Sequence, residues 1–390
     1  MIKRTAFLGV LLAALGLSGG LALAASELPS INLAEDVFPT VVSSNEGATR
    51  LYVGNDGSGD SVLCVDAQTG QTLWSYAADA HSDGGPIFPR GILPALIGSH
   101  LFVMNWYHPS LVVLDSTDGT LADSYEFSEE AMHMTHGFVD GEAILMVTNL
   151  SSVHYFREEP FIFLREDALP GTSPQKTAFD PGSSTLFIPL LEVDLVVAHA
   201  LNWNGGSLSV SPLQAGTGDM PTACVPDANG STVGVVSIAD GMIFLYDKQT
   251  LTFQGAYGGL FSVADAAYKD GKLIVLSYHD PDAGDVYKGD ILSFDFLTCQ
   301  STSSGLPDRY PLTIEPTDIP GCVWAVDRGI YIGGGEIGDG ALLQVDTTSA
   351  QVTEIHMLSG QNLFTHYDAV TQKLFVSDPP THSIRVFQLP

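Results

Sequence analysis

Four short polar segments of the chain carry a histidine, mostly beside an aromatic residue, and each lies next to an apolar run. An aromatic ring beside an imidazole gives an apolar body with a polar tip, which suits contact with a ligand or a protein partner. The predicted contact residues are Trp106, Tyr107, His108, His154, Tyr278, His279 and His382. The alternative is that polar loops carry such residues without binding anything.

A denser group of metal-binding side chains lies in the segment Met132–His136, which reads Met-His-Met-Thr-His. Imidazole and thioether groups suit copper, and His366 occupies a matching position near the end of the chain. The spacing fits no fixed metal motif, and methionine-rich segments are commonly packing elements. Copper ligation by His133, His136 and His366 and simple packing are therefore the two interpretations.

An acidic loop offers a different kind of metal site. Carboxylates at alternating positions can hold calcium, and this loop carries Asp280, Asp282, Asp285 and Asp290. It lacks the acidic fifth position, the central glycine and the final glutamate of an EF-hand. A calcium site and an ordinary solvated loop remain the alternatives.

The familiar catalytic motifs are missing from the sequence. Beyond the expected signal peptide it contains no G-x-S-x-G nucleophile elbow. Its triple glycine at 333–335 lies between expected strands and opens no helix that could bind a phosphate. These observations favour a binding protein over a hydrolase or a nucleotide-dependent enzyme.

One short apolar strand recurs along the whole chain and must position these residues. Its eight copies start at residues 51, 101, 144, 186, 233, 273, 330 and 374. Each is followed by a polar loop and a second strand, and several second strands end in an aspartate that can open a tight turn. A period of about 45 residues with four short strands is typical of a β-propeller blade.

The sequence therefore predicts an all-β, eight-bladed β-propeller, with seven blades as the alternative because the units between His154 and Val210 are irregular. The strands are almost continuously apolar, which indicates sheets covered on both faces. The last unit has room for only three strands, so residues Ser30–Phe38 are expected to add the missing outer strand. That pairing would close the ring and remove an open sheet edge.

The segment 52–55 (Tyr-Val-Gly-Asn) and the segment that follows at 62–74 resemble two related repeat families. One is the YVTN-type bacterial propeller repeat. The other is the repeat of pyrroloquinoline-quinone-type (quinoprotein-like) propellers, Asp-x-x-Thr-Gly-x-x-x-Trp, matched here by Asp66, Thr69, Gly70 and Trp74. The resemblance implies that Trp74 docks on the neighbouring blade. It carries no activity, because the superfamily includes both dehydrogenases and non-catalytic scaffolds.

The amino terminus reads as an export signal. Lys3 and Arg4 precede an apolar run, and an Ala-x-Ala site ends at Ala24, which predicts a signal peptide over residues 1–24 and a mature domain over residues 25–390. The expected location is periplasmic or secreted, with no membrane span after cleavage. Cys64, Cys224, Cys299 and Cys322 then allow three full disulfide pairings. Cys64, inside an apolar strand, is expected to be a buried thiol.

The net charge of the chain limits the classes of partner that it can bind. The chain carries 15 Lys and Arg against 45 Asp and Glu, a net charge of −30, which argues against nucleic acid and anionic membrane surfaces. We therefore expect an exported, non-catalytic scaffold that binds a protein partner or a small ligand on its loop face, most simply without a cofactor. The alternative is a periplasmic quinoprotein-type oxidoreductase, or the large propeller subunit of an amine-dehydrogenase-like complex. If the protein has a cofactor, calcium is expected ahead of copper or pyrroloquinoline quinone. The oligomeric state is left open.

Overall fold

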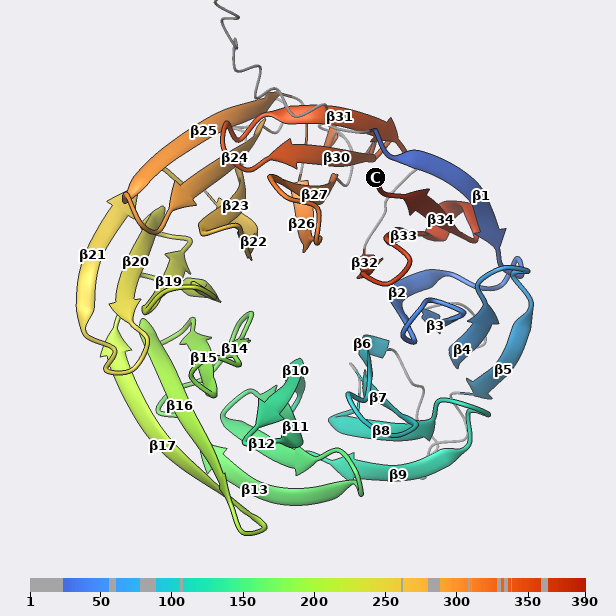
Figure 1. Ribbon diagram of the computed structural model, residues 1–390, viewed down its shortest axis with the longest axis horizontal. Helices are drawn as coiled ribbons and strands as arrows, with labels where there is room; N and C mark the ends of the chain where they lie inside the picture. The colour runs from blue at the N-terminus through green and yellow to red at the C-terminus, as the bar shows by residue number, and fades with distance from the viewer. Residues whose placement is uncertain are drawn as a thin grey trace, which may run out of the picture.

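The computed structural model is a closed ring of eight four-stranded antiparallel sheets, the blades of a β-propeller (Figure 1). It describes residues 24–55, 61–77, 89–105, 108–260, 262–279, 288–307, 309, 311–327, 331–332, 336–337, 339–358 and 364–390. The predicted signal peptide lies almost wholly outside these residues. Eight blades is the predicted number, and the seven-bladed alternative is wrong because the irregular units between His154 and Val210 belong to two complete blades.

Blades are numbered here in chain order, and their strands are given from the axis outward. Blades 1 to 4 are formed by β2 (Pro39–Ser44), β3 (Arg50–Asn55), β4 (Ser61–Asp66) and β5 (Thr72–Ala77); by β6 (Pro89–Pro94), β7 (His100–Asn105), β8 (Ser110–Asp115) and β9 (Leu121–Glu126); by β10 (Ala131–Val139), β11 (Glu142–Asn149), β12 (Ser152–Arg157) and β13 (Ile162–Ala168); and by β14 (Ala178–Asp180), β15 (Thr185–Leu190), β16 (Leu195–Asn204) and β17 (Ser207–Gly216). Blades 5 and 6 are formed by β18 (Pro221–Pro226), β19 (Thr232–Ser237), β20 (Met242–Asp247) and β21 (Phe253–Gly258), and by β22 (Ser262–Lys269), β23 (Lys272–His279), β24 (Lys288–Asp295) and β25 (Gln300–Pro307). Blades 7 and 8 are formed by β26 (Pro311–Pro316), β27 (Cys322–Asp327), β30 (Ala341–Asp346) and β31 (Val352–Met357), and by β32 (Thr365–Asp368), β33 (Lys373–Asp378), β34 (Ser383–Gln388) and β1 (Ser26–Asn32).

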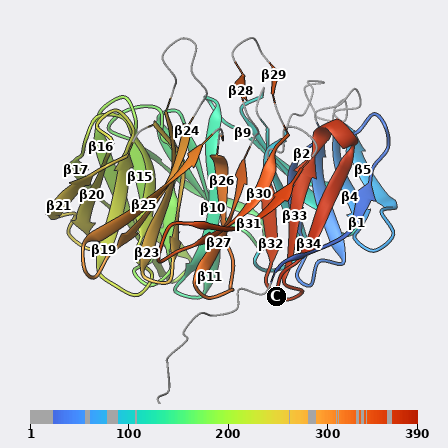
Figure 2. The same cartoon turned by 90° about the horizontal axis from the view of Figure 1, so that it is seen from above.

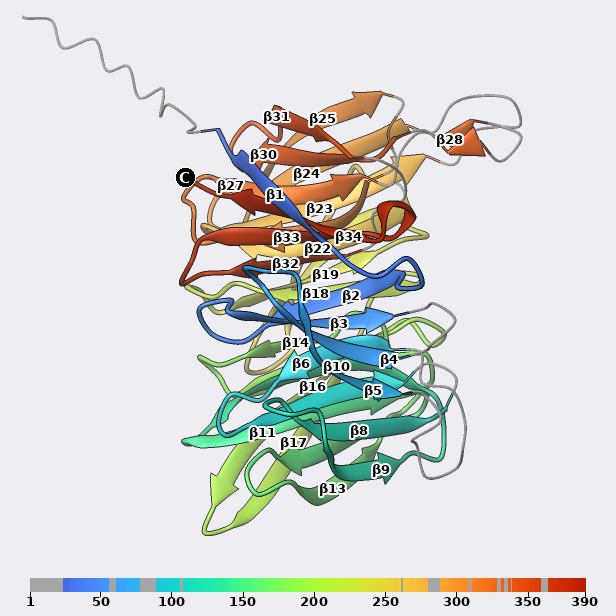
Figure 3. The same cartoon turned by 90° about the vertical axis from the view of Figure 1, so that its right-hand side faces the viewer.

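The ring closes through the first strand, as predicted, although that strand begins earlier than expected. β1 pairs antiparallel with β34 and supplies the outer strand of blade 8, where it lies along the outside of the ring (Figure 3). The strand covers Ser26–Asn32 and not Ser30–Phe38. Arg385 forms an ion pair with Glu27 across the two strands.

The hydrophobic core lies between the blades. Eight apolar clusters of buried residues each draw on two neighbouring blades, one cluster at each junction of the ring. Each sheet is thus covered on both faces, which explains why its strands are apolar throughout rather than alternating. Packing on both sides leaves a blade little freedom to move relative to its neighbours.

The aspartates that end the third strands form the predicted turns. The carboxylate of Asp66 accepts hydrogen bonds from the backbone N–H groups of Gln68 and Thr69 and from the Thr69 hydroxyl. These bonds, those of Thr69 first, hold the pKa of Asp66 below its ordinary value. Turns of the same kind are opened by Asp115, Asp247, Asp295 and Asp346.

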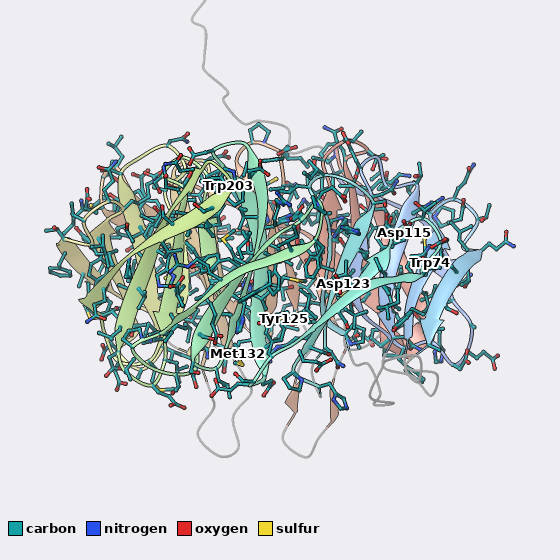
Figure 4. The ribbon with its side chains drawn as sticks, turned by 90° about the horizontal axis from the view of Figure 1, so that it is seen from below. Trp74, Asp115, Asp123, Tyr125, Met132 and Trp203 are labelled. Atoms are coloured by element: carbon teal, nitrogen blue, oxygen red, sulfur yellow. The ribbon has the colours of Figure 1, made fainter. Side chains whose placement is uncertain are left out.

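The docking contact implied for Trp74 is present at the junction of blades 1 and 2. Its indole Nε1–H donates to the carbonyl oxygen of Ser116 at 3.3 Å, and its ring covers Gly119 in the turn between β8 and β9. Figure 4 shows Trp74 beside Asp115 at this junction. One aromatic side chain therefore ties the outer strand of one blade to a turn of the next.

Three further features complete the fold. A short hairpin, β28 (Tyr331–Ile332) with β29 (Glu336–Ile337), is inserted into blade 7 between β27 and β30 and projects from the disc (Figure 2). All four cysteines are unpaired, and Cys64 is the buried thiol that the sequence predicts. Within the part of the chain that is described, no helix has the length and apolar character needed to cross a membrane.

Candidate binding face and axial belt

The two faces of the disc differ in the connections that they carry. Because each blade is an antiparallel meander, its second strand ends and its third strand begins on the same face, where the links between blades also lie. We name this the loop face, and the β28–β29 hairpin projects from it (Figure 2). The opposite face, here named the turn face, carries the tight turns such as Asp66–Gly70.

Most of the predicted contact residues fall on the loop face. His108 lies between β7 and β8, and both Tyr278 and His279 lie at the end of β23, where the second strand of blade 6 stops. His108 and Tyr278 are half-buried. The side chain of His279 and all of Trp106 and Tyr107 lie outside the described residues. Their role in binding stays a prediction.

The expectation for His154 is wrong. It lies within β12, the third strand of blade 3, with 2% of its surface exposed. Its Nε2 is hydrogen-bonded to Asn149 and Ser152, and its ring packs against Tyr125 and Phe127. Burial lowers its pKa. His154 therefore stabilises the junction of blades 2 and 3 and is not available on a loop.

His382 also has a structural contact. It sits in the left-handed backbone region after a short 3-10 turn, Pro379–Thr381, between β33 and β34. Its Nδ1 is 3.0 Å from the carbonyl oxygen of Val37, and its ring packs edge-on against Phe38 at 4.7 Å. The residue thus joins the last blade to the segment that leads into the first.

The predicted copper ligands are separated from one another. His133 and His136 lie three positions apart on β10, and neighbouring positions of a strand alternate between the sheet's faces, so they point to opposite sides. His133 is hydrogen-bonded to Thr177, His136 to Glu158 and His366 to Ser44. No group of three or more metal-binding side chains occurs among the residues that the structure describes. The three histidines therefore do not meet at one site, and copper binding stays a prediction.

The structure describes only part of the predicted calcium loop. Asp280, Asp282 and Asp285 lie outside the described residues, and Asp290 belongs to β24. The calcium site stays a prediction.

A belt of polar contacts surrounds the axis of the ring and was not predicted. We name it the axial belt, and it joins the inner strands of different blades. Lys176, just before β14, forms an ion pair with Asp265 on β22 and donates to the carbonyl oxygen of Ala266 at 3.0 Å. The same Asp265 carboxylate accepts the N–H of Ile314 on β26 at 2.9 Å.

The belt continues with contacts between blades 7 and 8, blades 8 and 1, and blades 2 and 3. The hydroxyl of Thr365 and the N–H of Tyr367, both on β32, donate to the Glu315 carboxylate of β26. His366 is 2.8 Å from the Ser44 hydroxyl of β2. Arg90 of β6 pairs with Glu130, immediately before β10. Each of these bonds crosses from one blade to another.

Burial around the axis shifts the pKa of several members of the belt. Desolvation raises the pKa of Glu315 to about 7. It lowers the pKa of His366 to about 4, and it does the same for His133, where the positive charges of Lys176 and Arg90 add to the effect. Both imidazoles are therefore neutral at pH 7. A titrating carboxyl near the axis could exchange a proton, but Glu315 is already engaged by blade 8.

A separate cavity of about 430 Å³ opens near the turn-face ends of blades 3, 4 and 5. Its lining includes Asp140, Ser183, Asn202 and Lys248. The Lys248 ammonium is buried, 2.9 Å from the Asp180 carboxylate and 2.8 Å from the carbonyl oxygen of Asp227. The only buried cation of this lining is thus already neutralised, and the cavity offers polar contacts without a reactive group.

Comparison with known proteins supports the fold alone. No protein-family model matches the chain, and no curated protein matches its sequence. Among solved structures, the chain is similar to Sqt1 of Saccharomyces cerevisiae, with a TM-score of 0.68, 12% identity, and coverage of 94% of this chain and 100% of that one.

Two further solved structures are bacterial β-propeller proteins. BamB from Moraxella catarrhalis has a TM-score of 0.60 and 14% identity, with 94% of this chain and 98% of that chain covered. Hydrazine synthase of Kuenenia stuttgartiensis has a TM-score of 0.57 and 11% identity, with 91% and 96% covered. The chain shares the β-propeller architecture with bacterial and eukaryotic proteins of different names.

Proposed function

We propose that this protein is an exported, non-catalytic scaffold whose loop face binds a protein partner. The observation that carries the proposal is the axial belt. Its charged side chains, Lys176, Asp265 and Glu315 among them, are bonded between blades. A propeller enzyme would need such groups free to meet a substrate, whereas a scaffold needs them to hold the ring rigid.

Packing and strand pairing elsewhere in the ring also make it rigid. Every junction is filled by an apolar cluster, and the first and last strands of the chain are paired. Loops on such a frame are preorganised, so a partner loses little affinity to ordering them. We place the contact on the loop face around His108, Tyr278 and His279.

The test is a paired substitution on each face. His108→Ala with His279→Ala should abolish recovery of the native partner, identified by cross-linking in the source cells, because it removes two polar tips from the contact. Glu46→Ala with Gln68→Ala changes two exposed turn-face residues and is the matched control. Equal recovery by both double variants would count against the loop face.

The absorbance and metal content of the native protein distinguish the oxidoreductase alternative from the scaffold. A quinone or copper centre would give visible absorbance and a stoichiometric metal. We propose that the purified protein carries neither, and a bound chromophore would replace the scaffold assignment with the quinoprotein one.

A further inference from the structure

The outer strands of three consecutive blades carry no charged residue. These strands are β17 (Ser207–Gly216), β21 (Phe253–Gly258) and β25 (Gln300–Pro307), and they follow one another along the rim (Figure 1). We name them the uncharged sector. The outer strands β1, β9, β13 and β31 all carry carboxylates, and β5, which is also uncharged, stands alone between β1 and β9. Such a gap is unexpected in a chain of net charge −30.

Two strands of the sector, β17 and β25, also lack the usual irregularity of an outer strand. In six blades, blade 5 with β21 among them, the pairing of the outer strand shifts register, as a β-bulge does. The ladders β16–β17 and β24–β25 run without a shift. Bulges, charges and prolines are the devices that keep an edge strand from pairing with another chain. β17 retains Pro212 in its interior, whereas β25 has none of the three before its final residue.

β25 is therefore an open edge that is ready to pair. It is regular over eight residues, and Ser301, Thr302 and Ser303 are exposed. Within the described part of the chain, none of these three hydroxyls makes a hydrogen bond. Serine and threonine side chains that face each other across an antiparallel pair of strands stabilise it.

Two exposed apolar side chains lie near the turn face, one on blade 6 and one on blade 5. Leu297, in the turn between β24 and β25, has 91% of its surface exposed. Phe253, at the start of β21 in the neighbouring blade, has 56% exposed. Covering both would bury apolar area next to the strand pair, which is favourable.

We propose that a second copy of this chain occupies the edge, with β25 of each copy pairing antiparallel about a two-fold axis. The distribution of charge favours a second copy as the partner. Two molecules of net charge −30 repel each other over most of their surfaces, and the uncharged sector is where that repulsion is smallest. A basic partner would be drawn to the carboxylates elsewhere and would gain nothing from a charge-free strip.

Because two copies repel each other through their charges, salt should favour the dimer. Sedimentation velocity of the mature protein should show a dimer whose fraction grows as salt rises from about 0.01 M to about 1 M, because the Debye length falls from about 30 Å to about 3 Å. Ser303→Glu should sediment as a monomer at both salt concentrations, since it places a carboxylate near the middle of β25 in each copy and the two like charges come close together across the pair. Ala122→Glu, the same change in charge on β9, should dimerise as the wild type does.

Backbone amide exchange provides a readout that needs no variant. At high salt the amides of residues 300–306 in β25 should exchange more slowly as protein concentration rises. The proposal is overturned by a wild-type monomer under all these conditions, by a dimer that weakens with salt, by equal behaviour of the two glutamate variants, or by a monomer that instead accepts a partner protein's strand on β25.

Discussion

At the scale of single residues, the junction between Trp74 and Gly119 shows how one contact fixes two blades. Gly119 has φ of 76°, and a Cβ atom there would lie 2.4 Å from the Trp74 ring. Only glycine satisfies both conditions, since the left-handed region disfavours a side chain and the indole fills the space. The repeat motif at Asp66–Trp74 therefore depends on a residue of the next blade.

Substitution of Gly119 by alanine tests this contact. We expect Gly119→Ala to lower the free energy of unfolding by about 1–3 kcal/mol more than Gly47→Ala does. Gly47 has φ of 78° with open space around it, so its alanine variant measures the backbone cost alone. Urea unfolding of the two variants gives the difference, and equal values would mean that the indole does not press on Gly119.

Two histidines show where prediction from the sequence fails. His154 and His108 look alike in the sequence, each next to an apolar run, yet one is buried in β12 and the other lies in a loop. The difference is the position at which the strand begins, and a shift of a few residues moves a side chain from a loop into a junction. A single sequence does not fix that position.

At the scale of elements, the axial belt links inner strands that are far apart along the chain. Lys176 and Asp265 are separated by 89 positions. Polar residues inside otherwise apolar inner strands, such as Glu315 in Pro-Leu-Thr-Ile-Glu-Pro, were the signal available in the sequence. Their partners could not be assigned, because the blades' twist decides which inner side chains meet.

The pH dependence of Glu315→Gln tests the belt. Burial raises the pKa of Glu315 from 4.5 to about 7, so the folded protein keeps a proton that the unfolded chain releases. The stability contributed by Glu315 therefore falls as pH rises from 4.5 to 7. Glutamine does not titrate, and the variant should gain at least about 1 kcal/mol relative to the wild type between pH 4.5 and pH 8.

The neighbours of Glu315 do not alter that expectation. Lys176, Asp265, His133 and His366 are the same in both proteins, so the comparison isolates the substitution at position 315. Glu46→Gln, at an exposed turn, controls for the loss of one negative charge. Denaturant unfolding across this pH range supplies the measurement, and a difference that does not change with pH would contradict the raised pKa of Glu315.

At the scale of the whole molecule, the ring follows from patterns that a sequence displays directly. The recurring strand predicts the number of blades, apolar strands predict sheets covered on both faces, and the short last unit predicts closure by the first strand. The copy expected from residue 330 was assigned wrongly, because Tyr331–Ile332 forms β28 of the inserted hairpin and the second strand of blade 7 is β27 (Cys322–Asp327). The function has no comparable pattern, since loops on a propeller vary without changing the frame.

The central claim is that the loop face, and not the axis, makes the functional contact. Hydrogen exchange of the protein with and without its native partner tests it most directly. We predict slower exchange at the ends of β7, β23 and β33 and at the starts of β8, β24 and β34, with the inner strands unchanged. Protection confined to β22, β26 and β32, which carry Asp265, Glu315 and His366, would contradict the account.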